Sequence, residues 1–363
     1  MFRMYTTLIV AQLALTLTLF SPTILFNPTY FNQHYSLYLI IPIILFLPAI
    51  YFIESTHKGL NASLTQKIRF PSQILLTVSF CSYILSNLIT LGLIIKHGDY
   101  QILYLENSLK HYITPLKALG LPAFYFAFAK VCGETRFFQE RLAWAVLLSS
   151  AITGSRGLLI FAIISALIIR KGVSVFLKPK VVLLGIFMIL CFLLVGYFRE
   201  PITIDFDDYI LLTIGSIAEF STSNLNINAC GIDSNIIVTE AVPLFFGVLD
   251  ESRSTYLLTS CISPEAIENG YGIAVSALGE SVLALGSKWY LLYYAYLIIS
   301  SLLAALLITR KSSLLRVTGM AFIPFFLYSV RAELVYPYVF LIRIFFATLM
   351  LYFIDAILPN KAR

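Results

Sequence analysis

One stretch decides the architecture of this chain: residues 142–169, which read LAWAVLLSSAITGSRGLLIFAIISALII. As a single helix these 28 residues would be about 42 Å long, whereas the hydrocarbon core of a bilayer is roughly 30 Å thick. Two glycines flank a Ser–Arg pair in the middle, so we expect two short helices with a break at Arg156. Non-helical backbone at membrane depth is tolerated only where it lines a cavity in the protein. The break therefore predicts such a cavity, recessed below the membrane surface.

The composition of the whole chain supports a membrane protein. Of its 363 residues, 59% are hydrophobic and only 12% are charged, and the mean hydropathy is +0.87. Soluble domains carry about 25% charged residues. This composition excludes a secreted soluble domain, a nucleic-acid binder and a disordered chain. The net charge of +6 is therefore not a nucleic-acid signal, and its meaning depends on where the basic residues lie.

The apolar segments predict an all-α polytopic membrane protein with about ten transmembrane helices, in one domain covering residues 1–363. A spanning helix needs roughly 20 mostly apolar residues. Seven segments meet this directly: 5–26, 35–53, 74–95, 112–129, 180–198, 289–309 and 336–354. Three are shorter: 142–153, 157–169 and 317–330. The first span is predicted to be retained, not cleaved as a signal peptide, because it lacks a small-residue cleavage site.

The basic residues give these spans an orientation. With the N-terminus inside, the inner segments hold most of the Lys and Arg residues and few acidic ones, namely Glu54, Glu134, Glu140 and Asp355. Cytoplasmic loops carry such an excess of Lys and Arg. We therefore expect both termini in the cytoplasm.

Residues 199–288 form one long outer region with helices that are re-entrant or lie on the membrane surface. Its apolar piece at 272–286 is only about 22 Å long as a helix and contains Glu280. A carboxylate embedded there is a candidate general base, because partial burial raises its pKa; alternatively it pairs with an arginine. The other acidic residues of this region are expected to be mostly solvated: Asp205, Asp207, Asp208, Glu219, Asp233, Glu240, Asp250 and Glu251.

Several arginines are predicted at the level of the outer leaflet. Arg156 lies in the break, Arg331 lies in a tight turn between 317–330 and 336–354, and Arg199 lies at the outer end of span 180–198. The planar guanidinium suits phosphate oxygens, so converging arginines predict a site for an anionic headgroup. Each arginine can also simply snorkel or cap a helix. Arg343 lies inside span 336–354, where it either contacts substrate or pairs with a carboxylate.

The sequence offers no pattern for a metal or haem. It has no CxxC motif, and its four histidines are scattered. We therefore expect no metal and no cofactor. Aromatic residues of the outer region, Tyr271 among them, either stack on sugars or simply pack.

The motifs together resemble those of Wzy-type bacterial O-antigen polymerases. Residues 153–159, with the Ser-Arg-Gly sequence at Ser155, are similar to a signature of that family. The long outer region is also typical, and its end, from Gly270 through Glu280 to Gly286, resembles the family's Gly-rich segment. Arg331 falls where these proteins often carry a further Arg. The Pro-Arg and Trp-Pro pattern of the family is absent, since Pro243 is followed by Leu-Phe-Phe and Arg253 comes only later.

The resemblance implies a GT-C-like membrane glycosyltransferase at the periplasmic face of the bacterial inner membrane. Its substrates would be oligosaccharide repeat units on undecaprenyl diphosphate, and its surroundings the lipid bilayer; a polysaccharide chain-length regulator is a further partner. Glu280 would be the catalytic base. The diphosphate would be bound by Arg156, Arg331, Arg199 and Arg253, and the substrate cavity lined by Ser155, Arg343 and Tyr271.

Two other functions remain open at this point. An O-antigen ligase would use the same arginine chemistry but usually carries a periplasmic His, and no His occurs between 199 and 288. A lipid-linked oligosaccharide flippase, a transporter, would show two repeated halves and short loops on both sides. The sequence has neither feature, which favours the polymerase.

Overall fold

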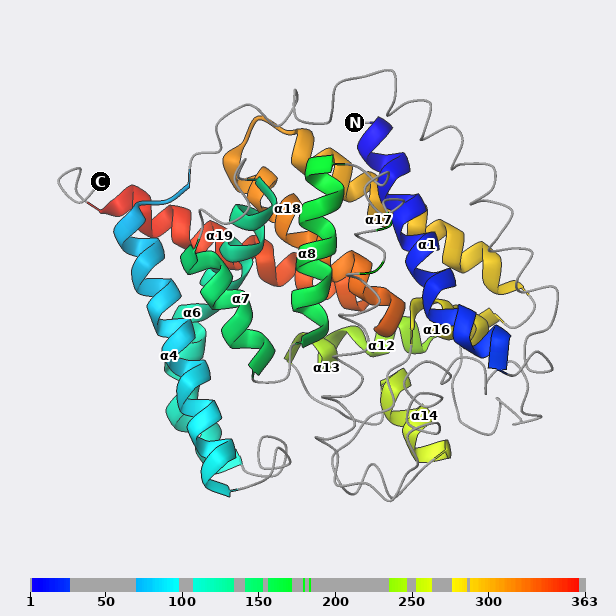
Figure 1. Cartoon of the computed structure of the whole chain (residues 1–363), viewed down its shortest axis with the longest axis horizontal. Coiled ribbons are helices and arrows are strands. Elements are labelled where there is room, and N and C mark those ends of the chain that lie inside the picture. The colour runs from blue at the N-terminus through cyan, green and yellow to red at the C-terminus, as the bar shows by residue number, and fades with distance from the viewer. Residues whose placement is uncertain are drawn as a thin grey trace.

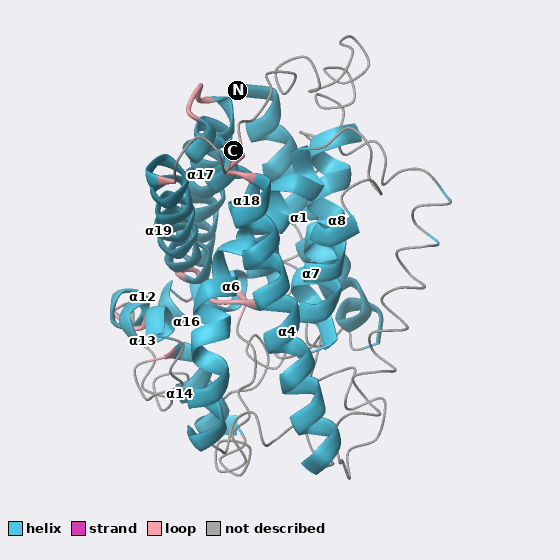
Figure 2. Ribbon diagram, turned by 90° about the vertical axis from the view of Figure 1, so that its left-hand side faces the viewer, coloured by secondary structure: helices cyan, strands magenta, loops and turns pink. Residues whose placement is uncertain are grey.

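The computed structural model of the chain describes residues 2–26, 70–97, 107–133, 141–152, 156–171, 179, 183, 235–246, 253–262, 276–285 and 288–358. Within these ranges all regular secondary structure is helical, as predicted. Long helices form a bundle, and the short helices α12 (Ile236–Thr239), α13 (Ala241–Phe246), α14 (Ser254–Ile262) and α16 (Ala277–Leu285) gather at its lower end (Figures 1 and 2). The count of ten spans and the GT-C-like arrangement stay predictions.

Three helices of the described part are long and apolar enough to cross a membrane: α4 (Gln73–His97), α17 (Trp289–Thr309) and α19 (Tyr336–Ile357). On α4, the large apolar side chains that remain exposed recur at helical spacing, at Ile74, Val78, Leu85 and Leu88. A stripe of this kind suits contact with lipid tails. The predicted span at 35–53 lies outside the described residues, as does that at 180–198 apart from residue 183.

The helices run in alternating directions. In Figure 1, α4 and α7 (Arg141–Ile152) run downward, and α6 (Asn107–Gly133) and α8 (Arg156–Lys171) run upward. The turn between α17 and α18 (Ser313–Tyr328) lies at the upper end. The described helix ends that adjoin predicted cytoplasmic segments, such as the end of α6 and the start of α7, therefore lie at the end of the bundle opposite to the short helices.

Both predicted interruptions are present as helix ends. α7 ends at Ile152 and α8 begins at Arg156. With 12 and 16 residues, these helices are about 18 and 24 Å long, each shorter than the bilayer core. Near the C-terminus, α18 passes into the short helix η5 (Ser329–Arg331), and α19 begins five residues later.

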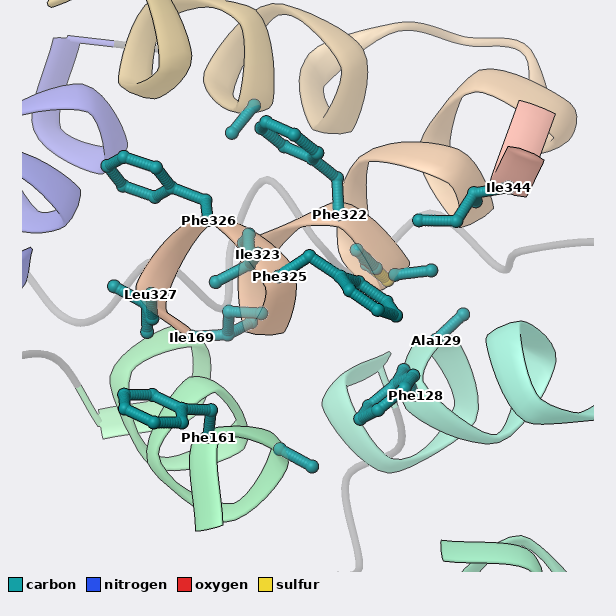
Figure 3. Close-up of a cluster of buried hydrophobic side chains, with 14 of the residues drawn as sticks. Phe128, Ala129, Phe161, Ile169, Phe322, Ile323, Phe325, Phe326, Leu327 and Ile344 are labelled. Carbon is teal, nitrogen blue, oxygen red and sulfur yellow. The ribbon is translucent and has the colours of Figure 1, made fainter. Parts of the chain in front are cut away.

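α18 forms the centre of the hydrophobic core. Every residue from Arg316 to Leu327 is buried, and the helix contacts α6, α8, α17 and α19. Its phenylalanines point in several directions (Figure 3): the Phe325 ring stacks on Phe340 at a centroid distance of 4.5 Å and meets the edge of Phe128 at 5.5 Å. A helix that is apolar on all sides belongs in an interior, and this packing fixes the position of η5.

Two glycines allow helices to approach closely. A Cβ atom on Gly120 of α6 would lie 2.7 Å from the Cα atom of Tyr83 in α4, and one on Gly319 of α18 would lie 2.7 Å from the Cβ atom of Leu307 in α17. Small residues at helix contacts are a common means of packing within membranes. These two contacts therefore require glycine.

Buried polar side chains tie α1 (Phe2–Phe26) to the C-terminal helices. Gln12 donates from Nε2 to Ser329 Oγ at 2.9 Å, and the Tyr296 hydroxyl donates to the same oxygen at 2.6 Å. The Thr16 hydroxyl is 2.8 Å from the Tyr293 hydroxyl. Buried polar groups are costly without partners, so these bonds fix α1 against η5 and α17.

Candidate active site

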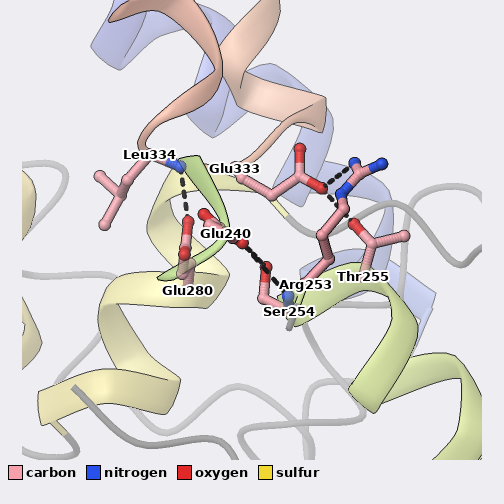
Figure 4. Close-up of polar contacts among 7 residues, drawn as sticks. All are labelled: Glu240, Arg253, Ser254, Thr255, Glu280, Glu333 and Leu334. Carbon is pink, nitrogen blue, oxygen red and sulfur yellow. Dashed lines mark hydrogen bonds and ion pairs between the residues drawn. The ribbon is translucent and has the colours of Figure 1, made fainter. Parts of the chain in front are cut away.

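Three buried glutamates from distant parts of the chain meet where the short helices contact η5 (Figure 4). Glu240 lies between α12 and α13, Glu280 lies in the first turn of α16, and Glu333 lies between η5 and α19. Their relative exposures are 0%, 0% and 3%. Carboxylates are almost never this buried unless they are paired, so the partners of each one matter.

Glu240 binds the start of α14. Its Oε2 atom accepts hydrogen bonds from the Ser254 backbone N–H at 3.2 Å and from the Ser254 hydroxyl at 2.9 Å. The first N–H groups of a helix lack partners within the helix, and the helix dipole favours a negative charge there. Glu240 thus holds α14 against the segment between α12 and α13.

Glu280 is fixed by the start of its own helix. The Ser276 hydroxyl accepts a hydrogen bond from the Gly279 N–H at 2.9 Å, which is the arrangement of an N-cap. One residue later, Glu280 Oε2 accepts the backbone N–H of Leu334 at 2.5 Å. The carboxyl group is therefore held against the turn that joins η5 to α19.

Glu333 pairs with Arg253. Its Oε1 atom lies 2.6 Å from Arg253 Nη2 and also accepts the Thr255 hydroxyl. The Arg253 side chain is 15% exposed, so the ion pair is screened only weakly by water. Together with the Glu240–Ser254 contacts, this pair places the beginning of α14 over the three-glutamate cluster.

The environment favours a proton on Glu280. Burial raises its pKa well above the ordinary value, and the neighbouring Glu240 raises it further, while the Leu334 N–H opposes this. Burial also raises the pKa of Glu240. The two carboxyl groups share a side-chain hydrogen bond, which raises the pKa of Glu280 and lowers that of Glu240. A proton on Glu280 supplies the donor of this bond.

Such a pair is suited to proton transfer. Two adjacent carboxyl groups with raised pKa values titrate as a unit, and a carboxyl group with a raised pKa can exchange protons with a substrate hydroxyl near neutral pH. Among the described residues, no group of three or more His, Cys, Asp and Glu side chains is arranged to hold a metal ion.

The structure brings two of the predicted site residues together. Glu280 and Arg253 are both in the cluster, although Arg253 pairs with Glu333. Arg331 ends η5, two residues before Glu333, and Arg156 begins α8. The side chains of Arg156 and Arg331 lie outside the described part of the chain, as do the predicted residues Ser155, Arg199 and Tyr271.

Arg343 packs among aromatic rings. Its guanidinium carbon lies 5.0 Å from the ring centre of Phe340 and 5.3 Å from that of Phe245. Phe245 belongs to α13 and Arg343 to α19, which are in contact. A guanidinium over a ring face is attracted to it, so Arg343 attaches a short outer helix to the bundle.

The expectation that Glu240 is solvated is wrong, since it is fully buried. Its acceptor contacts with Ser254 and the neighbouring Glu280 explain why. A signal was available in the sequence: Glu240 interrupts an apolar run from Ile236 to Leu244, as Glu280 interrupts 272–286. Glu333 was not singled out, because a single acidic residue beside a turn has no distinctive pattern.

Comparison with known proteins finds no matching family model, no matching curated protein and no matching solved structure.

Proposed function

We propose that this chain is a membrane glycosyltransferase that polymerises undecaprenyl-diphosphate-linked oligosaccharide repeat units into O-antigen or a related surface polysaccharide. The observation that carries the proposal is Glu280: a fully buried carboxyl group in the short helix before the last spans, fixed by the Leu334 N–H and adjacent to a second buried carboxyl group, Glu240. The Ser-Arg-Gly and Gly-rich motifs of the sequence support it independently.

The reaction needs one proton acceptor and one anion-binding group. The bond between the anomeric carbon of the donor glycan and its lipid diphosphate breaks, and the diphosphate leaves with the electron pair. An acceptor hydroxyl oxygen forms the new bond to that carbon, and its proton passes to the ionised form of Glu280, whose raised pKa makes it a stronger base. Because the donor is already activated, no nucleotide is required.

The remaining residues take roles that follow from their charge. Arg156 and Arg331 would bind the diphosphate and stabilise the charge that develops on it, with Arg199 assisting. Glu240, beside Glu280, keeps the pKa of the base high, and the Arg253–Glu333 pair holds the start of α14 in place. The substrate would enter from the periplasmic face of the bacterial inner membrane.

The test is the surface glycan of the host bacterium after deletion of the gene, displayed on a gel. Complementation with wild type should restore a ladder of chain lengths. Glu280→Gln, Arg156→Ala and Arg331→Ala should each leave core plus a single repeat unit at normal protein level. Arg310→Ala is the matched control, because Arg310 is exposed and lies at the opposite end of the bundle.

The outcomes separate the candidate functions. Loss of all glycan on the core in the deletion strain would indicate a ligase or a flippase. An unchanged ladder in that strain would reject the proposal, and a normal ladder in the Glu280→Gln strain would reject the assigned base.

A further inference from the structure

A pocket of about 460 Å³ lies between α4, α6 and α7, at the end of the bundle opposite to the glutamate cluster. Its polar lining includes Lys130 at the end of α6 and Arg141 at the start of α7. Its apolar lining includes Phe70, Leu76, Phe80 and Leu142. None of the described residues that line it is acidic. The pocket therefore combines two positive charges with a hydrophobic wall.

The residues of this pocket are held in place by specific contacts. The Lys130 ammonium lies 5.4 Å from the centre of the Phe70 ring, and Phe70 packs edge-on against Phe126 at 6.3 Å. The backbone N–H of Ser72 donates to Asp355 Oδ1 at 2.9 Å. This bond fixes the segment that leads into α4 and carries Phe70.

The pocket also lies at the right level for a lipid headgroup. It contains the first turns of α4, a helix long enough to cross the bilayer. Just along the same helix, Ile74 and Val78 are 62% and 58% exposed and begin the apolar stripe that faces outward. A molecule with its anionic group at Lys130 and Arg141 would have its apolar part continue along α4.

We propose that this pocket binds the phosphate of an anionic phospholipid, with the acyl chains lying along the exposed stripe of α4. Basic pockets between transmembrane helices bind anionic headgroups in this way. The positive-inside pattern places the site in the cytoplasmic leaflet. The proposal is independent of the glycosyltransferase activity, because the pocket and the glutamate cluster lie at opposite ends of the bundle.

The test measures lipid retention by the purified full-length protein in detergent, using native mass spectrometry during titration with phosphatidylglycerol. Wild type should retain phosphatidylglycerol at least fivefold more strongly than phosphatidylcholine, which has no net charge. The double variant Lys130→Gln/Arg141→Gln should lose this preference. The matched control is Arg310→Gln/Lys311→Gln, which removes two exposed charges at the same end of the bundle and should behave as wild type.

A second variant keeps both charges and fills the pocket. Thr77 is exposed and lines the pocket, so Thr77→Trp should weaken phosphatidylglycerol retention without disturbing the core. Equal retention by wild type and both pocket variants would overturn the proposal. An equal loss of phosphatidylglycerol retention in the Arg310/Lys311 control would also overturn it. So would displacement of phosphatidylglycerol by millimolar inorganic phosphate as effective as displacement by the lipid itself, because this would indicate a site for a free anion.

Discussion

The Oε2 atom of Glu280 accepts a hydrogen bond from the backbone N–H of Leu334, 54 residues later in the chain. This contact joins α16 to the turn between η5 and α19, which also carries Glu333 and follows Arg331 directly. The proposed base and one of the proposed diphosphate-binding arginines are therefore attached to the same short piece of backbone. A shift of α16 relative to this turn would change the distance between the two residues.

Glu280→Gln should abolish polymerisation while the protein stays folded. The glutamine carbonyl oxygen can still accept the Leu334 N–H, and its amide group can donate toward Glu240, so the variant imitates the protonated glutamic acid. It cannot accept a proton. The ladder assay reports activity, and the unfolding temperature in detergent should equal or exceed that of wild type. Glu280→Ala leaves the Leu334 N–H without its acceptor. This variant should lower the free energy of unfolding by about 1–3 kcal/mol.

The stability of the protein should fall as the pH rises above the ordinary glutamate range. The pKa values of Glu280 and Glu240 are raised by folding, so the folded state binds more protons than the unfolded state above about pH 4.3, the unperturbed value. Stability then decreases with pH until the raised pKa is passed, by at most about 1.4 kcal/mol per pH unit for each group.

Thermal unfolding of wild type and Glu280→Gln between pH 5 and pH 9 measures this effect. The variant should show the weaker pH dependence, because it lacks one of the two groups. Other titrating residues are common to both proteins and cancel in the difference. Parallel curves would mean that Glu280 is ionised in the folded protein.

Arg253→Gln should destabilise the protein by about 3 kcal/mol, because Glu333 would keep a buried charge without its counter-ion. The double variant Arg253→Gln/Glu333→Gln should recover a large part of this loss, since both charges are then removed. A double-mutant cycle of unfolding free energies gives the coupling between the two residues. Additive effects would show that the ion pair contributes nothing to the folded state.

Gly120→Ala should destabilise the bundle and Gly92→Ala should not. The new methyl group at Gly120 would meet the backbone of Tyr83, whereas nothing lies within 4 Å of a Cβ atom at Gly92. Overpacking costs about 1–3 kcal/mol, and alanine in an open helical position gains up to about 1 kcal/mol over glycine. Both glycines lie inside helices, so the difference in unfolding temperature isolates the contact between α4 and α6.

The sequence predicted those features that depend on short segments. The helix ends at Ile152 and Arg156, and the turn at Ser329–Arg331, follow from local apolar runs and the residues that interrupt them. Glu280 was found because a charge in a short apolar segment is unusual. The Arg253–Glu333 pair was not found, because its partners are 80 residues apart and neither segment indicates the other. Glu240 was misplaced although it interrupts an apolar run, because the groups that contact its carboxyl group, Ser254 at the start of α14 and Glu280 in α16, lie elsewhere in the chain.

The bonds from Gln12 and Thr16 to the C-terminal helices constrain the order in which the protein can be assembled. Their partners Ser329 and Tyr293 lie 317 and 277 residues later in the chain. At a synthesis rate of about 5–20 residues per second, these partners are made roughly 15 to 60 seconds after α1. Until then its amide and hydroxyl groups lack their final acceptors and donors. Chains that stop before Ser329 should therefore be recognised as incomplete by membrane quality-control proteases, with α1 as the exposed element.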